Sequence, residues 1–204
     1  MNTKTVYPAA VFGGELRVPG DKSVSQRIAM LAALAKGTSE VHGFLRGEDA
    51  MSTLGAMCSL GASAKFEGDV LKITGTGGKR IEPANPLDMG NSGTGTRLLA
   101  GLLAGQKMTV TMTGDASLSR RPMGRIKTPL ERMGAKLDLT GEKGTLPLTI
   151  HGTPLHGIRY ELPMASAQVK SCVLLAGLFA EGKTTVIEPR PTRDHTEKLF
   201  QALD

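Results

Sequence analysis

Apolar residues recur at helical spacing in three blocks of the sequence, and each block ends at a glycine. The blocks cover residues 31–37, 99–105 and 175–182. Glycine commonly ends helices, and each block is followed by a stretch rich in Thr and Val, which favour strands. The pattern therefore predicts three apolar helices, each followed by a β-strand.

A second set of elements follows the first two blocks. Further helices are predicted at residues 49–61 and 122–134, and both end at a glycine. Two pairs of short strands come next, and each pair predicts a β-hairpin because its strands are joined by a turn that contains glycine. The pairs are residues 64–66 with 70–74 and residues 136–139 with 146–150. The predicted order in each unit is strand, helix, strand, helix, strand, strand.

These elements form an internal repeat. The first leucines of the three apolar blocks, Leu31, Leu99 and Leu175, lie 68 and 76 residues apart, a period that suits a whole α/β unit rather than a short solenoid repeat. A helix is predicted at residues 194–203 without a closing hairpin after it, so the third unit is expected to be incomplete. The sequence predicts an α/β (α+β) fold with units at residues 13–80, 81–152 and 153–204.

The composition agrees with a folded protein that works inside the cell. Apolar residues make up 40% of the 204 residues and charged residues 22%, and no apolar run approaches the roughly 18 residues that span a membrane. The first ten residues lack the basic and apolar regions of a secretory signal. Cys58 and Cys172 lie in apolar helical patterns, which predicts reduced core thiols rather than a disulfide or metal site. We therefore expect a cytoplasmic protein.

The net charge of +6, from 25 basic and 19 acidic residues, predicts an anionic partner. Nucleic acid is disfavoured, because the chain has no Trp and only 3% aromatic residues for base stacking. The four histidines, His42, His151, His156 and His195, lack metal-ligand spacing and form no convincing Ser-His-Asp arrangement. We therefore expect no metal catalysis, and favour a small phosphorylated or carboxylated ligand.

Three segments that precede the apolar helices have the composition of anion sites at helix N-termini. In the first, residues 18–27, a Pro-Gly turn leads into a helix that either Asp21 or Ser23 can cap. Lys22, Ser23 and Arg27 can face a ligand there, beside free backbone N–H groups. Lys22 is the favoured proton-handling group, because burial among cations would lower its pKa.

The other two segments are less specific when taken alone. Residues 90–97 are rich in glycine, which lets a backbone approach an anion closely, but a plain turn explains them equally well. Residues 164–171 offer Ser166 as a cap and the amide of Gln168, although an ordinary helix start is the simpler interpretation. Three equivalent helix starts in related units are nevertheless predicted to converge, and to bring positive helix ends to one region.

Two further segments supply arginines. Residues 114–123 contain Arg120 and Arg121 before a helix-starting proline. One of the two is predicted to contact an anion, because Arg grips carboxylate and phosphate bidentately, and a solvated loop is the alternative. In residues 190–195, Arg193 is the candidate anion contact and Asp194 the candidate helix cap.

Five motifs along residues 16–203 together resemble the 5-enolpyruvylshikimate-3-phosphate synthase family, in the bacterial branch with a Ser-Ala-Gln segment. The motifs are VPGDKSVSQR, MGNSGTGTR, GDASLSRRPMGR, SAQVKS and PTRDHTEKL. The resemblance implies transfer of an enolpyruvyl group from phosphoenolpyruvate to the 5-hydroxyl of shikimate 3-phosphate, with release of phosphate. This is a step on the route to chorismate and aromatic amino acids. The resemblance implies no metal or organic cofactor, and it names glyphosate as an inhibitor to test.

The resemblance also implies an architecture. The family has two similar domains, each an inside-out α/β barrel of three βαβαββ units, which close over the ligands. On that basis residues 13–204 form the N-terminal domain, and the C-terminal domain, which carries the family's main acid and base residues, is absent from this chain. Residues 1–12 are expected to be poorly ordered, because in the family they pack with the other domain. We expect the chain alone to bind shikimate 3-phosphate without turnover.

Site residues carry over at positions that match the family's motifs. The implied contacts to shikimate 3-phosphate are Lys22, Ser23, Arg27, Ser166, Ala167, Gln168 and Arg193. The implied contacts to phosphoenolpyruvate are Lys22, Asn91, Gly93, Arg121 and Gln168. Lys22 is shared by both substrates, and it is the catalytic residue that the resemblance assigns within this chain.

Two alternatives stay open at this point. A UDP-N-acetylglucosamine enolpyruvyl transferase is disfavoured, because Asp21-Lys22-Ser23 and Ser166-Ala167-Gln168 suit a shikimate phosphate better than a nucleotide sugar. The other alternative is a non-catalytic module that binds a phosphorylated ligand or nucleic acid. Salt dependence separates these two ligands, since affinity for nucleic acid falls steeply with salt.

Overall fold

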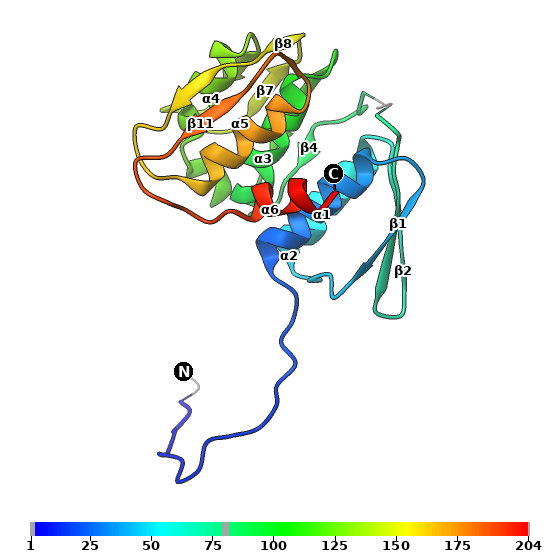
Figure 1. Cartoon of the computed structure of the whole chain (residues 1–204), viewed down its shortest axis with the longest axis vertical. Coiled ribbons are helices and arrows are strands. Elements are labelled where there is room, and N and C mark those ends of the chain that lie inside the picture. Colours follow the sequence, from blue (N-terminus) through cyan, green and yellow to red (C-terminus); the bar gives the residue numbers. More distant parts are fainter. Residues whose placement is uncertain (1–2, 79–81, 204) are drawn as a thin grey trace.

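The computed structural model describes residues 3–78 and 82–203. Residues 3–21 form an extended tail that leads away from the body (Figure 1). No residue of the tail belongs to a helix or strand, and apolar side chains such as Val6 and Phe12 are exposed there. The strand predicted to open the first unit is therefore wrong, because a strand needs a neighbour to pair its backbone groups. Met1 and Asn2 lie outside the described residues, so poor order of residues 1–12 remains a prediction.

The first part of the body is two helices with a three-stranded antiparallel sheet. Its elements are α1 (Lys22–Leu34), β1 (Thr38–His42), α2 (Glu48–Ser59), β2 (Ser63–Glu67) and β3 (Val70–Thr74). β3 lies between β1 and β2, so that Thr74 is opposite both Thr38 and Ser63. The hairpin predicted from residue 64 to residue 74 is confirmed. The predicted unit boundary at residues 80 and 81 falls outside the described residues.

The second part contains a four-stranded sheet. Its elements are β4 (Leu87–Asp88), α3 (Gly93–Ala104), β5 (Thr109–Thr113), the 3₁₀ turn η1 (Leu118–Arg120), α4 (Gly124–Arg132), β6 (Lys136–Leu139) and β7 (Leu148–His151). The strand order is β4-β5-β7-β6, and only the β4–β5 pair is parallel. Apart from η1, the order of elements is the predicted strand, helix, strand, helix, strand, strand.

The third part has short strands around one buried helix. Its elements are β8 (Leu155–His156), β9 (Arg159–Glu161), α5 (Ala167–Gly177), β10 (Ala180–Glu181), β11 (Thr185–Ile187) and α6 (His195–Leu203). β10 pairs with β8 and β11 with β9, both in parallel. The helix predicted to run to residue 182 ends at Gly177 instead, because Ala180 and Glu181 leave the helix to pair with β8.

Helix α3 lies at the centre of the core, and α5 packs against it. The two helices approach closely at Gly101, where an added Cβ would lie 2.2 Å from the carbonyl oxygen of Cys172. Cys172 is fully buried, whereas Cys58 is only partly buried, and both thiols are free. The largest fully buried side chains are Met30, Met57, Leu60, Leu71, Ile73, Met89, Leu98, Leu99, Leu102, Leu103, Met112 and Leu118.

The architecture is an α/β fold in which helices occupy the middle and small sheets lie outside them. In Figure 1, α1, α3 and α5 run through the body between the sheet of β1 and β2 and the strands β7, β8 and β11. The described strands form separate sheets of two to four strands, and the inside-out barrel stays a prediction. Within the described ranges, every helix is too short or too polar to cross a membrane.

Candidate functional site

Helices α1, α3 and α5 each begin with a side-chain cap. The Asp21 carboxylate accepts a hydrogen bond from the Val24 N–H at 2.8 Å, so Asp21 rather than Ser23 caps α1. The Ser92 hydroxyl accepts from the Gly95 N–H at the start of α3, and the Ser166 hydroxyl accepts from the Val169 N–H at the start of α5. Each helix start therefore keeps further N–H groups and a partial positive charge that can attract an anion.

The three helix starts meet, as the sequence predicts. Gln168 on α5 donates through Nε2 to the Thr94 hydroxyl on α3 at 2.9 Å. Arg27 on α1 donates through Nη2 to the Ser171 hydroxyl on α5 at 2.8 Å. Side chains from segments more than 70 residues apart in the sequence thus close one small polar region between α1, α3 and α5.

A small cavity opens where the helix starts meet. It is lined by Ser23, Arg27, Thr94, Ala167, Gln168, Arg193 and His195. All of these except Thr94 and His195 were predicted from the resemblance as contacts to shikimate 3-phosphate, and the structure brings those predicted residues together around one cavity. Sequence reasoning missed Thr94 and His195: Thr94 lies inside the glycine-rich motif, but His195 was weighed only as a metal ligand.

Arg27 is the most deeply placed cation of this cavity. It is 4% exposed, and three of its N–H groups are used: Nε by the Thr196 hydroxyl, Nη1 by the Ser23 carbonyl and Nη2 by the Ser171 hydroxyl. A guanidinium carries five N–H donors, so two remain for a ligand. Burial, and then repulsion from Arg193, lower the pKa of Arg27. An anion in the cavity would relieve that repulsion.

A second group of arginines lies at the start of α3. A Cβ on Gly93 would lie 3.0 Å from Nη1 of Arg121 and 3.1 Å from Nη1 of Arg97, so both guanidinium groups face this glycine. Burial, followed by repulsion from Arg121 and Arg125, lowers the pKa of Arg97. Of the two adjacent arginines, Arg121 reaches the site, whereas Arg120 is exposed and lines another hollow.

Arg121 is held in place through Asn91 and Asp115. Nη2 of Arg121 donates to Oδ1 of Asn91, whose amide nitrogen donates to Oδ2 of Asp115 at 2.7 Å. The other oxygen of Asp115 accepts from the Leu118 N–H at 2.7 Å. Asn91 therefore orients the guanidinium of Arg121. Its direct contact with phosphoenolpyruvate stays a prediction.

Ser166 lies beside the first cavity. It lines a neighbouring hollow together with Arg97, Pro122, Arg125, Gln168 and Val169. Gln168 belongs to both hollows. The amide of Gln168 therefore stands between the cavity of Arg27 and the arginines of the α3 start.

Lys22 differs from its prediction. Its side chain is 52% exposed, and Nζ forms a 2.7 Å ion pair with Asp49 at the start of α2. The predicted burial among cations is wrong, because α2 delivers a carboxylate that the local sequence around Lys22 does not reveal. Lys22 can still reach a ligand from the rim of the site, with Asp49 as its partner.

Gln26 is a structural residue that sequence reasoning passed over. It is fully buried, and Nε2 lies 2.5 Å from the Ser92 hydroxyl and 3.1 Å from the Thr53 hydroxyl. The contact joins α1, α2 and the cap of α3. Gln26 belongs to the motif VPGDKSVSQR, but no pattern in the sequence indicated that its side chain is directed into the core, toward Ser92 and Thr53.

In residues 3–78 and 82–203, no group of three or more His, Cys, Asp or Glu side chains is arranged to hold a metal ion.

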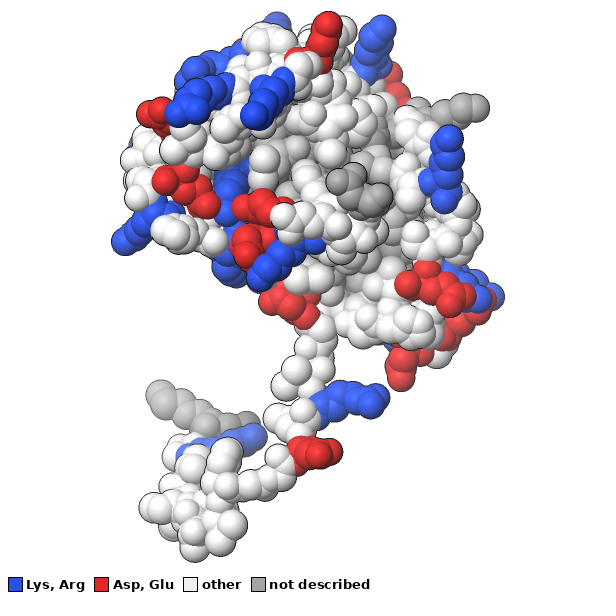
Figure 2. All heavy atoms as spheres, in the orientation of Figure 1, with Lys and Arg blue, Asp and Glu red and all other residues white. Residues whose placement is uncertain are grey.

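Basic side chains do not form one continuous patch on the visible face of the molecule. Figure 2 shows them spread over that face and interspersed with acidic ones. On that face, the arrangement differs from the continuous basic track that binds nucleic acid.

Comparisons with known proteins bear on the family of this chain. The sequence model described as EPSP synthase (3-phosphoshikimate 1-carboxyvinyltransferase) matches residues 6–204. A 3-phosphoshikimate 1-carboxyvinyltransferase of Hydrogenovibrio crunogenus is 56% identical over 202 residues, which are 97% of this chain and 45% of the relative. The corresponding protein of Methylococcus capsulatus is 56% identical over 201 residues, again 45% of its length.

A solved structure shows the same likeness. EPSP synthase from Acinetobacter baumannii superposes with a TM-score of 0.89 at 56% sequence identity, over 93% of this chain and 43% of that one. The chain thus spans less than half the length of the relatives it matches. Because the match covers nearly the whole chain at this identity, the protein belongs to the EPSP synthase family.

Proposed function

We propose that this chain supplies one wall of an active site that transfers the enolpyruvyl group of phosphoenolpyruvate to the 5-hydroxyl of shikimate 3-phosphate. The observation that carries the proposal is the position of Gln168, which joins two anion sites. The reaction needs two anionic substrates side by side, and the site offers two separate groups of cations with a neutral amide between them.

We assign the first substrate, shikimate 3-phosphate, to the mouth of the small cavity where the helix starts meet and to the neighbouring hollow that Ser166 lines. The N–H groups at the start of α5 and the side chains of Ser166 and Gln168 face the phosphate, because helix N-termini bind phosphate well. Ser23, Arg27 and Arg193 hold the rest of the molecule. Fixed helix dipoles and arginines replace the hydration that the anionic groups of the substrate lose when they leave water.

The second substrate, phosphoenolpyruvate, fits beside Gly93. Arg121 and Lys22 face its negative groups, and Asn91 orients Arg121. The 5-hydroxyl oxygen then adds to the C2 carbon of the enol double bond. Its proton passes to a base and C3 takes a proton from an acid, both from the part of the enzyme that the resemblance places outside this chain, which gives a tetrahedral intermediate. Loss of a proton from C3 and departure of inorganic phosphate restore the double bond. The arginines lower the barrier mainly by holding two mutually repelling anions together.

Because the chain spans about 45% of the length of its relatives, we propose that these 204 residues bind shikimate 3-phosphate without turnover. Calorimetric titration with shikimate 3-phosphate tests the binding, and phosphate release with both substrates tests the turnover. Lys22→Met and Arg193→Met are expected to weaken binding about 10-fold each, the effect of losing one charge-assisted hydrogen bond. Lys36→Met is the control and is expected to bind as the wild type does, because Lys36 is exposed and lies just beyond the C-terminal end of α1, far from the helix start.

The titration also separates the alternatives. A UDP-N-acetylglucosamine ligand that bound more tightly than shikimate 3-phosphate would overturn the assigned substrate. Binding of a short RNA that fell steeply with salt would instead favour a nucleic-acid module. Supply of the remaining part of a relative's chain is expected to restore turnover, with glyphosate as an inhibitor at the phosphoenolpyruvate side.

We place this activity in the cytoplasm, in keeping with two free thiols.

A further inference from the structure

A buried lysine lies next to the site without lining its cavity. Lys170 is on α5, two residues after Gln168, and its side chain is 5% exposed. Its Nζ atom lies 2.7 Å from Oε2 of Glu188 and 2.6 Å from Oε1 of Glu197. One cation thus bridges two carboxylates, one in the loop after β11 and one in α6.

The three charges depend on one another. Burial disfavours the charged amine, but the hydrogen bonds to Glu188 and Glu197 outweigh it and raise the pKa of Lys170. Burial also opposes the charge on Glu188, and its hydrogen bonds to Lys170 and Thr192 still lower the pKa of that carboxyl. Loss of the buried amine leaves two carboxylates, 18% and 32% exposed, without their cation.

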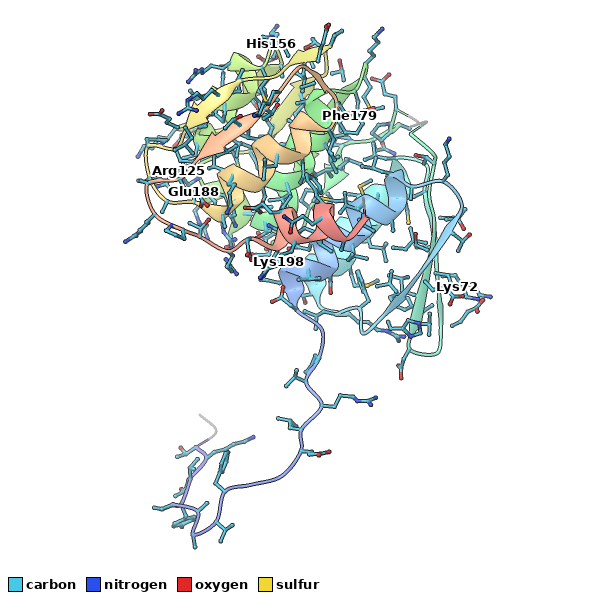
Figure 3. The ribbon with its side chains drawn as sticks, viewed as in Figure 1. Lys72, Arg125, His156, Phe179, Glu188 and Lys198 are labelled. Atoms are coloured by element: carbon cyan, nitrogen blue, oxygen red, sulfur yellow. The ribbon has the colours of Figure 1, made fainter. Side chains whose placement is uncertain are left out.

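The two carboxylates stand at the two ends of one segment. Glu188 directly follows β11, and Glu197 lies in the first turn of α6. The residues between them include Arg193 and His195, which line the cavity where the helix starts meet. Figure 3 shows Glu188 at the β11 end of this segment and Lys198 on α6 beyond the other end.

Further contacts fasten the same segment. The Thr192 hydroxyl donates to Oε1 of Glu188, which folds the chain back on itself. The Thr196 hydroxyl lies 2.8 Å from Nε of Arg27 and 2.8 Å from the hydroxyl of Ser171. Arg27 holds the segment while also lining the cavity. Lys170 also holds the segment, but it does not line the cavity, so its amine does not touch a ligand there.

We propose that Lys170 is a positioning residue that, through Glu188 and Glu197, sets Arg193 and His195 against the phosphorylated ligand. The inference rests on the proposed function, because it assigns affinity for shikimate 3-phosphate to a residue that does not touch it. Lys170→Met removes the amine at similar length, and the two carboxylates then repel each other. The segment between them moves away from α5, and Arg193 leaves the cavity.

The first test is binding of shikimate 3-phosphate by calorimetry. Lys170→Met is expected to weaken binding about 10-fold, whereas Lys170→Arg, which keeps the bridging cation, should stay within about 3-fold of wild type. The matched control is Lys198→Met: Lys198 pairs with Asp194 at 3.1 Å, but its side chain is 70% exposed. An equal loss in both methionine variants would overturn the proposal.

A double-variant cycle separates positioning from general damage. If Lys170 acts through Arg193, then Lys170→Met adds less than about 2-fold to the loss caused by Arg193→Met alone. Losses that multiply in the double variant would show that the two residues act independently, and would contradict the proposed link. A merely structural role of Lys170 does not produce this coupling.

The second test needs no ligand. Hydrogen exchange of the backbone amides in residues 192–197 is expected to speed up at least about 5-fold in Lys170→Met and to stay unchanged in Lys198→Met. If wild type fails to bind shikimate 3-phosphate, the proposed function fails while the exchange result still decides the positioning role. Should Lys170→Met not fold, Glu197→Ala removes one arm of the bridge and takes its place in both tests. Unchanged exchange and affinity in that variant would overturn the proposal.

Discussion

Nη1 of Arg97 donates a 3.0 Å hydrogen bond to Oε1 of Gln168, across 71 residues of sequence. A guanidinium can only donate, so the contact forces the amide oxygen of Gln168 toward α3 and leaves its NH₂ for Thr94. Arg97 also donates to the carbonyl of Pro122 at 3.0 Å. One side chain thus ties the α3 start, the loop of residues 114–123 and α5 together.

Arg97→Met is expected to lower the free energy of unfolding by about 1 kcal/mol, because the half-buried amide oxygen of Gln168 loses its donor, while relief of the repulsion from Arg121 and Arg125 offsets part of the cost. Urea denaturation measures the change. Arg125→Met removes an exposed arginine from the same region, and this control should change stability by less than about 0.5 kcal/mol. Equal stability of the two variants would show that the Arg97 contacts contribute nothing net.

Gly101→Ala is expected to be among the most damaging small substitutions in α3. The added Cβ would lie 2.2 Å from the carbonyl oxygen of Cys172, so α3 and α5 must separate at a cost of about 1–3 kcal/mol or more. Gly55→Ala in α2 is the matched control, since a Cβ there meets nothing within 4 Å. That variant should gain about 0.5–1 kcal/mol from better helix propensity. Thermal unfolding of both variants decides the point.

Gly93→Ala tests the phosphoenolpyruvate side. The new methyl group would press on Nη1 of Arg121 and of Arg97 at 3.0 and 3.1 Å, and it would fill space beside the proposed ligand. We expect weaker inhibition by glyphosate in the enzyme completed with a relative's remaining part. Folding should change little, since the two contacted atoms end flexible side chains. An inhibition constant equal to that of wild type would count against the assignment of Gly93.

Asp115 predicts a pH dependence of stability. Hydrogen bonds from the Leu118 N–H and then from Asn91 hold the pKa of Asp115 below its usual value. Its contribution is therefore present above the unfolded pKa of about 4 and is lost as pH falls through the folded pKa. Asp115→Asn should be less stable than wild type at neutral pH, and the difference should shrink on acidification.

Urea unfolding at neutral and acidic pH measures this difference for Asp115. Asp69→Asn removes a fully exposed carboxylate and serves as the control for the loss of one negative charge. If Asp115→Asn and Asp69→Asn give the same profile, the hydrogen bonds to Asp115 do not stabilise the loop of residues 114–123.

The two thiols are expected to differ in reactivity. Burial raises the pKa of Cys172 to about 12, and the thiolate is the reactive form. Burial also raises the pKa of Cys58, but that residue is only partly buried. Iodoacetamide at mildly alkaline pH should therefore label Cys58 slowly and leave Cys172 unmodified until urea is added, as mass spectrometry can show. Native labelling of Cys172 in a Cys58→Ser chain would mean that α5 opens from the core.

The helix starts were predictable because their signals are local. A cap is made within three residues, as Asp21 with Val24 and Ser166 with Val169 show, and the apolar spacing of α3 follows from burial of the whole helix. The repeat of three such starts also predicted that they meet. Helix α5 ended earlier than predicted because pairing of Ala180 with Leu155 is a tertiary contact that local propensity does not contain.

The sequence by itself determined the family, the α/β class and most cationic residues of the site, because motifs and periodicity depend on neighbours along the chain. Only the tertiary structure decided how those residues are paired. Asp49 reaches Lys22, Thr196 reaches Arg27, and Glu188 reaches Lys170. Charge and hydrogen-bond partners are chosen by distance in space, and the partners of Lys22 and Arg27 lie 27 and 169 residues away in sequence.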